Sequence, residues 1–401
     1  EKLLVENEEW LKYQNGSYTL TRERQDKPFG GYDPGEGKEE NADKGVLLRA
    51  GHSAYQLKNN TDAIRYLRLA ATSPDSTGYY ASYYLGAAYL LQQQKPLAFT
   101  AFENARRYVK DRRMAEESSF QYAKIAYDLG KPDLSITEFE KFLKAYPASP
   151  YVNEVKELLS QAYINANNVN KAIEYIEALP KRSPAVDRAY QKATYLKGSE
   201  YFNKDDYANA LTFFSKSLQY PIDPVFTAEA NFWSGEVHAL NRNWSEAAKT
   251  YQEVLTIGEA VPLELLMRNR YGLGYAFFNQ RVYDRALFNF KEFVSKSGAA
   301  NPNYADGVLR LADCHYVTKA YTEAIPVYRR GIQLKSPDSD YAYLQLGVIL
   351  GIERRYAEAT QELDQVLKLF PKSPYAEEAL FQRGQLDFEQ GKYGVAATEY
   401  G

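Results

Sequence analysis

The sequence predicts an all-α solenoid of about nine complete helical hairpins plus one truncated hairpin. A small residue recurs every 35–39 residues, and an alanine or serine follows each one twelve residues later. The 36 Tyr and 19 Phe among 401 residues are broad, stiff side chains that suit packing between helices. A repeat of this length is a two-helix unit that cannot bury its apolar face alone, so it must stack on its neighbours.

The small residues mark where the two helices of each hairpin cross, since a bulky side chain there would push the backbones apart. They are Gly51, Gly86, Ala123, Ser160, Gly198, Gly235, Gly274, Ala312, Gly347 and Gly384. Their partners on the second helices are Ala63, Ala98, Ser135, Ala172, Ala210, Ala247, Ala286, Ala324, Ala359 and Ala396. Aromatic residues four positions beyond the alanine, such as Phe214 and Phe290, are expected to fill the gap between one hairpin and the next.

The repeats occupy residues 44–401, with starts expected near residues 44, 79, 116, 153, 191, 228, 267, 305, 340 and 377. Two joints between hairpins are nearly the same, YPASPY at residues 146–151 and FPKSPY at residues 370–375. The first proline ends a helix, because the residue before it is pushed out of the α region. The serine can then cap the next helix, and the second proline suits its first turn.

Residues 1–43 form a separate N-terminal segment. Its start, EKLLVENEEWLKY, is expected to be the tail of a helix from a preceding repeat, and Gly16 to Asp43 is expected to be a loop. The chain starts with Glu1 and stops at Gly401 midway through an expected second helix. We therefore expect a longer native protein.

Four consecutive repeats carry the pattern best: YLKGSEYFNKDDYANALTFFSKSL, FWSGEVHALNRNWSEAAKTYQEVL, YGLGYAFFNQRVYDRALFNFKEFV and VLRLADCHYVTKAYTEAIPVYRRGI. This pattern resembles the tetratricopeptide repeat, a two-helix unit of 34 residues. The resemblance implies a right-handed superhelix whose first helices line a concave groove for peptides. The joints, and the runs FQYAKIAYDLG and AYQKATYLKGSEYF, resemble bacterial envelope repeat proteins, including large periplasmic ones of the Bacteroidetes.

No catalytic constellation is recognisable. The H-E-x-x-H, Walker and G-x-S-x-G motifs are missing from the sequence. Its single cysteine, Cys314, and two of its three histidines, His238 and His315, occupy positions expected to pack in the core. We expect no enzyme activity, no cofactor and no metal site. The net charge of −3 argues against nucleic-acid binding. The sequence contains no apolar run of 18 residues, so we expect no membrane span in it.

The residues expected to bind a partner lie on the first helices, three before or one after the small residue. They are Tyr83, Phe120, Lys124, Tyr195, Phe232, Glu236, Tyr271, Tyr275 and Asp313. The aromatic members could dock an extended or helical segment, with the charged members orienting it. The alternative is that a tightly wound array buries these rings between neighbouring helices.

The sequence therefore predicts a non-catalytic scaffold that binds protein or peptide partners in its groove, at a bacterial cell envelope or in the periplasm. One alternative is a cytoplasmic chaperone-like or regulatory module that grips peptide segments. Another is the docking region of a longer enzyme. Self-association is a further option, because a cut inside a hairpin leaves apolar surface uncovered.

Overall fold

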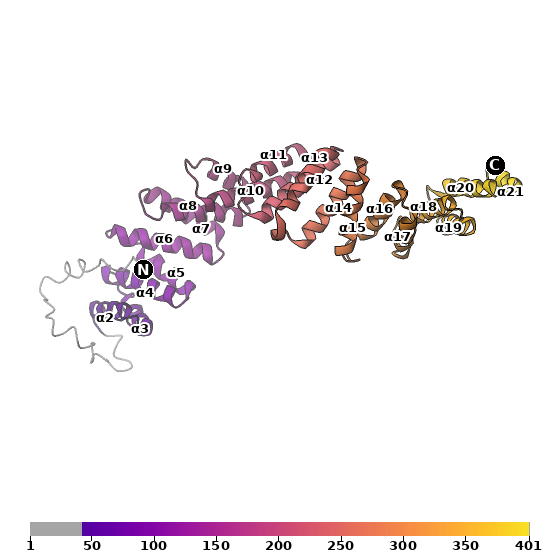
Figure 1. The fold of residues 1–401 in the computed structure, drawn as a ribbon. Coiled ribbons are helices and arrows are strands. Elements are labelled where there is room, and N and C mark those ends of the chain that lie inside the picture. Colours follow the sequence, from indigo (N-terminus) through magenta and orange to yellow (C-terminus); the bar gives the residue numbers. More distant parts are fainter. Residues whose placement is uncertain (1–41, 401) are drawn as a thin grey trace. The chain divides into compact units, whose positions relative to one another are not determined.

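The computed structural model describes residues 42–400, in which all regular elements are helices (Figure 1). The α-helices are α2 (Lys44–Gln56), α3 (Asn60–Ala70), α4 (Ser76–Leu91), α5 (Lys95–Ala105), α6 (Arg112–Asp128), α7 (Pro132–Ala145), α8 (Val152–Asn165), α9 (Val169–Glu177), α10 (Pro184–Phe202), α11 (Tyr207–Leu218), α12 (Pro224–Leu240), α13 (Trp244–Thr256), α14 (Leu263–Asn279), α15 (Tyr283–Lys296), α16 (Tyr304–Val317), α17 (Tyr321–Gln333), α18 (Ser339–Ile352), α19 (Tyr356–Leu369), α20 (Ala376–Glu389) and α21 (Tyr393–Tyr400). A short 3₁₀ helix, η4 (Gly258–Ala260), precedes α14. The predicted all-α solenoid is confirmed, whereas the loop and helix tail expected before residue 42 lie outside the described residues.

The helices pack in two units. The first unit holds the described residues up to Lys131 together with Lys144–Ser149, and the second holds Pro132–Leu143 and the chain from Pro150 onward. In the first unit α2 pairs with α3 and α4 with α5, while α3 packs on α4 and α5 on α6. In the second unit the pairs run from α8/α9 to α20/α21, and each second helix also packs on the next first helix. The core is therefore continuous along each unit.

The small residues and their partners, whose spacing predicted the hairpins, lie in the interior of the hairpins. All ten small residues are buried, and their ten partners are at most 1% exposed. Helix α10 starts at Pro184, seven residues before the expected start of its repeat, because Ser183 caps it by accepting a hydrogen bond from the Val186 backbone N–H at 3.3 Å.

At Gly51, Gly86, Gly198, Gly235, Gly274 and Gly347 the side chain that lies over the glycine comes from the same hairpin, which corrects one expectation. A Cβ added to Gly274 would lie 2.8 Å from the ring of Phe290, and one added to Gly198 would lie 2.6 Å from that of Phe214. These rings therefore fill the crossing within a hairpin, not only the gap between hairpins. Tyr251 does both, because a Cβ on Gly235 of its own hairpin or on Gly272 of the next would lie 2.5 or 2.8 Å from its ring.

The turn inside each hairpin has the same backbone conformation. The residue seven positions after the small residue has a positive φ in all ten repeats. These residues are Lys58, Gln93, Gly130, Asn167, Asp205, Arg242, Arg281, Lys319, Arg354 and Gly391. A left-handed residue commonly ends a helix, but glycine usually supplies it, and here only two of the ten are glycine. The packing of the two helices therefore imposes this conformation on ordinary side chains.

Candidate partner-binding site

A cavity of about 390 Å³ lies in the second unit, between the first helices α12 and α14. We call it the α12–α14 cavity. It is lined by Phe232, Trp233, Glu236, Ala239, Leu240, Trp244, Tyr251, Arg268, Tyr271, Gly272, Tyr275 and Asn303. Four of the nine predicted partner-binding residues meet there: Phe232, Glu236, Tyr271 and Tyr275.

Apolar rings and one exposed leucine form much of the cavity wall. The ring centroid of Trp233 lies 4.8 Å from that of Phe202 and 5.2 Å from that of Phe232. Trp244, at the start of α13, is half-buried, and Leu240, at the end of α12, is 55% exposed. This wall can receive a large apolar side chain from a partner.

Arg268 places a cation in the cavity. Its guanidinium lies 5.1 Å from the ring centroid of Phe232 and 5.9 Å from that of Trp233. The carboxylate of Glu229 is 3.9 Å from its nearest terminal nitrogen, beyond hydrogen-bond distance. Among the described residues its Nε has no hydrogen-bond partner and is shielded from solvent. The chain itself therefore leaves this guanidinium short of acceptors.

Glu236 is the acid of the cavity. Its side chain accepts a hydrogen bond from the Tyr251 hydroxyl at 2.5 Å. Burial raises the pKa of Glu236, because a charged carboxylate loses hydration there, while the hydrogen bond and nearby Arg268 oppose that rise. The cavity thus combines a cation that lacks acceptors with an acid that already has a donor.

The tyrosines among the predicted partner-binding residues connect one repeat to the next. The hydroxyls of Tyr83 and Tyr271 donate to Glu117 at 2.8 Å and to Asp306 at 2.8 Å. A third such bond joins Tyr195 to Glu229 at 3.4 Å. In each case a tyrosine three residues before one small residue meets an acid six residues before the next. These rings are half-buried, so each one ties neighbouring helices together and still presents an edge to solvent.

Three predicted residues are buried: Phe120, Asp313 and Phe232, the last only 4% exposed although it lines the α12–α14 cavity. Phe120 is only 2% exposed, because neighbouring helices cover its ring. Asp313 is only 3% exposed, and its carboxylate accepts hydrogen bonds from Arg310, Tyr328 and Tyr341. The expectation that Asp313 orients a partner is therefore corrected: it joins α16 to α17 and α18. Lys124, half-buried, lies with its Nζ 5.5 Å from the ring centroid of Phe120 in α6.

Asp313 belongs to a larger buried network. Arg310 bridges Asp313 and Asp306, with its Nε 3.3 Å from Asp306. The hydroxyls of Tyr271 and Tyr275 donate to the other oxygen of Asp306 at 2.8 and 2.6 Å. Since each of the two acids accepts several donors, the network stabilises the packing of three successive first helices.

The sequence pattern did not indicate a role at the site for Arg268, Trp233, Trp244, Asp306 or Arg310. One signal could have found two of them. Arg268 and Asp306 each stand six residues before the small residue of their repeat. The preceding repeat carries an aromatic residue three positions before its own small residue, and that residue lies opposite. Pairing these two positions along the chain would have revealed the contacts between repeats.

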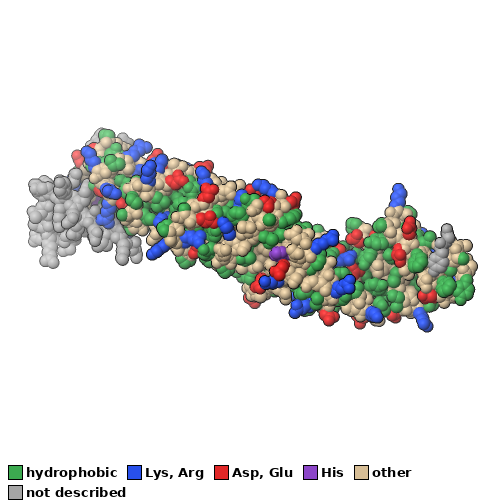
Figure 2. Space-filling view, turned by 90° about the horizontal axis from the view of Figure 1, so that it is seen from above, with side chains coloured by type: hydrophobic (Ala, Val, Ile, Leu, Met, Phe, Trp, Pro, Cys, Tyr) green, Lys and Arg blue, Asp and Glu red, His purple; other side chains and the backbone are tan. Residues whose placement is uncertain are grey.

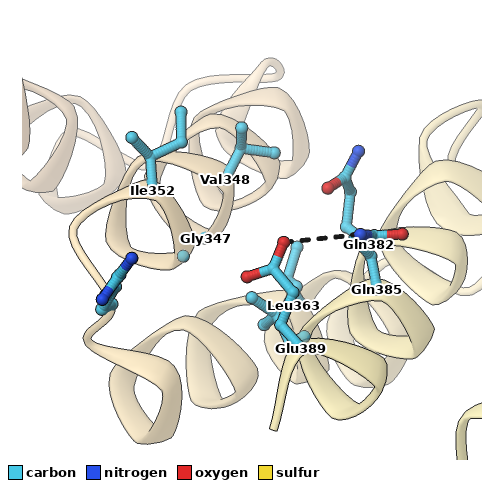
Figure 3. Close-up of a pocket in the computed structure, with 10 residues that line it drawn as sticks. Gly347, Val348, Ile352, Leu363, Gln382, Gln385 and Glu389 are labelled. Atoms are coloured by element: carbon cyan, nitrogen blue, oxygen red, sulfur yellow. Dashed lines mark hydrogen bonds between the residues drawn. The ribbon is translucent and has the colours of Figure 1, made fainter. Parts of the chain in front are cut away.

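A smaller cavity of about 210 Å³ lies among α18, α19 and α20 (Figure 3). Gly347, Val348 and Ile352 line one side, and Gln382 and Glu389 line another. The Gln385 amide donates to Glu389 at 3.4 Å. The lining of this cavity is more polar than that of the α12–α14 cavity and includes Arg354.

The described residues contain no group of three His, Cys, Asp or Glu side chains placed to hold a metal. Burial raises the pKa of the Cys314 thiol to about 12, which keeps it protonated at neutral pH.

Within residues 42–400 we find no helix with the length and apolarity that a bilayer crossing needs. The face seen in Figure 2 intersperses charges of both signs.

Three segments of the chain, residues 120–187, 195–262 and 271–339, match the tetratricopeptide repeat family and together cover just over half of it. No curated protein matches the chain. Similar solved structures include the tetratricopeptide repeat protein YrrB, described as having an unusual peptide-binding site (19% identity, 53% of this chain, 96% of that chain, TM-score 0.42). Another is the C-terminal part of a repeat protein from Cytophaga hutchinsonii (18% identity, 65% of this chain, 98% of that chain, TM-score 0.43). The chain belongs to the tetratricopeptide repeat family, whose members are in general non-catalytic scaffolds for protein–protein interaction.

Proposed function

We propose that this chain is a non-catalytic scaffold that binds segments of partner proteins in the groove lined by its first helices, with the α12–α14 cavity as the main anchor point. The observation that carries the proposal is the meeting of four predicted residues, Phe232, Glu236, Tyr271 and Tyr275, around one cavity of about 390 Å³. Ligand pockets measure roughly 300–1,000 Å³, so this one suits a few side chains of a segment.

The groove is rigid before a partner arrives. Tyr271 and Tyr275 are fixed by hydrogen bonds to Asp306, and Phe232 is held between Trp233, Tyr251 and the guanidinium of Arg268. A side chain that is already immobilised loses little conformational entropy on binding, so more of the contact energy appears as affinity. Aromatic anchors of this kind often dominate the energetics of an interface.

We propose that this scaffold works at a bacterial cell envelope or in the periplasm. The support is the resemblance of its YPASPY and FPKSPY joints to those of envelope repeat proteins, here taken to be of the Bacteroidetes type. Fractionation of cells that express the full gene tests the location: recovery with periplasm or envelope supports it, whereas recovery with cytoplasm favours the alternative of a cytoplasmic peptide-binding module.

A substitution at Leu240 tests the groove. Leu240→Asp puts a charge on the apolar wall of the cavity, and we expect it to abolish capture of the partner from native lysate. Leu91 stands at the same repeat position, five after the small residue, and is 58% exposed against 55% for Leu240. Leu91→Asp is therefore the matched control and should capture normally. Equal capture by both variants, each shown to be folded by circular dichroism, would rule out this cavity as the anchor.

A further inference from the structure

We propose that the α12–α14 cavity selects an internal partner segment that carries an aspartate or glutamate next to a large apolar residue. This inference rests on the proposed function and names the ligand chemistry of the same cavity. The carboxylate would pair with Arg268, and the apolar side chain would lie against Trp233, Leu240 and Trp244.

Arg268 lacks hydrogen-bond acceptors among the described residues. A guanidinium has five N–H donors, and none of those of Arg268 makes a hydrogen bond within residues 42–400. The facing acid cannot satisfy it, because one oxygen of Glu229 is 3.9 Å away and the other accepts from the Trp233 indole N–H at 3.0 Å. By contrast, Arg310 on the next first helix bonds to both Asp306 and Asp313. The donors of Arg268 are thus left for an acceptor from outside the chain.

Two aromatic rings hold the guanidinium of Arg268 in a fixed position. It lies over the rings of Phe232 and Trp233, and its side chain is 35% exposed. Cation–π contacts of this kind restrict the position of an arginine without using its in-plane donors. A carboxylate can therefore approach in the guanidinium plane and form two parallel hydrogen bonds.

The acid in the cavity restricts the charge of the ligand. Glu236 lines the same cavity and is close enough to Arg268 to interact with it electrostatically. Its negative charge opposes a second anion, so a dianionic phosphate is disfavoured more strongly than a single carboxylate. A carboxylate flanked by apolar surface best matches one cation beside three apolar walls.

The position of the cavity within the second unit favours an internal segment of the partner over a chain end. Repeats of the second unit continue on both sides of the cavity, since α11 packs on α12 and α15 packs on α16. The row of first helices therefore does not stop at Arg268, and a segment can run along it in both directions. The carboxylate that meets Arg268 is then a side chain of the segment.

The experiment uses fluorescence anisotropy to measure binding to the full chain of capped eight-residue peptides and of matched peptides with a free carboxyl terminus. One position carries tryptophan, phenylalanine or leucine, and the next carries aspartate, glutamate, their amides or lysine. Charge-assisted hydrogen bonds are worth about 1.5–3 kcal/mol, so we expect acidic peptides to bind roughly ten- to hundredfold tighter than their amides. Arg268→Gln should remove that difference, and Arg268→Glu should shift the preference to lysine. Arg188→Gln, an exposed position on α10, should change nothing.

Each other outcome overturns the inference in a distinguishable way. Acidic and amide peptides could bind with equal affinity, and Leu240→Asp could abolish the binding of both. That result would contradict the pairing of a carboxylate with Arg268 and would leave the proposed function standing. An acid preference that survives in Arg268→Gln would place the carboxylate elsewhere. Tight binding only by peptides with a free carboxyl terminus would replace the side chain by a chain end. Failure of every peptide to bind would reject the proposed ligand chemistry. The capture experiment with Leu240→Asp tests separately whether partners bind in the groove.

Discussion

Replacing Asp313 with alanine is expected to lower the free energy of unfolding by about 3–5 kcal/mol, the usual cost of removing one partner from a buried ion pair. The carboxylate is 3% exposed and accepts hydrogen bonds from Arg310, Tyr328 and Tyr341. Its loss leaves a partly buried cation and two hydroxyls without that acceptor, in a core that water cannot readily enter. Urea denaturation followed by circular dichroism measures the change.

The control for Asp313 is Glu253→Ala, at an exposed position inside α13. Surface substitutions usually stay within about 0.5 kcal/mol. Because each repeat is stabilised mainly by its neighbours, the loss should be concentrated in the repeats that the network joins, α14 to α18. Hydrogen exchange can locate it. A cost for Asp313→Ala no greater than that for Glu253→Ala would mean that the network is not formed.

Phe290→Ala is expected to destabilise the chain by about 3–5 kcal/mol, as a fully buried ring is lost and a cavity is left over Gly274. Phe288 lies two residues earlier on α15 and is 53% exposed. Phe288→Ala should therefore cost about 1 kcal/mol or less. Thermal unfolding of the two variants measures the difference. Similar melting temperatures would contradict the assignment of Phe290 as the ring that fills the helix crossing.

The spacing of small residues was sufficient to predict the architecture. A position that must be small is a strict steric demand, and it recurs in every repeat with its partner twelve residues later. All twenty positions are buried, as that demand requires. The sequence could not say which side chain meets the glycine, because Phe290 reaches back to Gly274 across a turn whose geometry was unknown.

The turn itself was unpredictable for a physical reason. Lys58, Arg242 and Lys319 adopt a left-handed backbone conformation that their residue types do not favour. Local propensity would assign glycine or asparagine to such a position. The energy that holds these residues there comes from packing between two helices, which no single stretch of sequence reveals.

The candidate site was predicted in part. Phe232, Glu236, Tyr271 and Tyr275 do line one cavity, because a period that places them on the first helices also places them on one face. Whether each ring faces a groove or a neighbour depends on side-chain hydrogen bonds between repeats. Those bonds explain why Asp313 is inside, and the failure of Glu229 to reach Arg268 explains why a cation remains for a partner.

The predicted aromatic residues thus combine two roles, partner binding and packing between repeats, which were alternatives on the sequence alone. Tyr271 stabilises the stack by donating to Asp306, and the same ring forms part of the cavity wall. A residue with both roles is a poor choice for testing binding alone, since its removal also loosens the repeats. Leu240, Trp244 and Arg268 separate the two effects better, because they contribute to the cavity more than to the core.

Hydrogen–deuterium exchange of the full chain, with and without its captured partner, tests the central claim most directly. When the partner binds, we expect slower exchange in the parts of α12 and α14 that line the cavity, residues 232–240 and 268–275, with little change on the second helices α11 and α15. Protection confined to second helices or to turns, with residues 232–240 and 268–275 unchanged, would contradict binding in the groove.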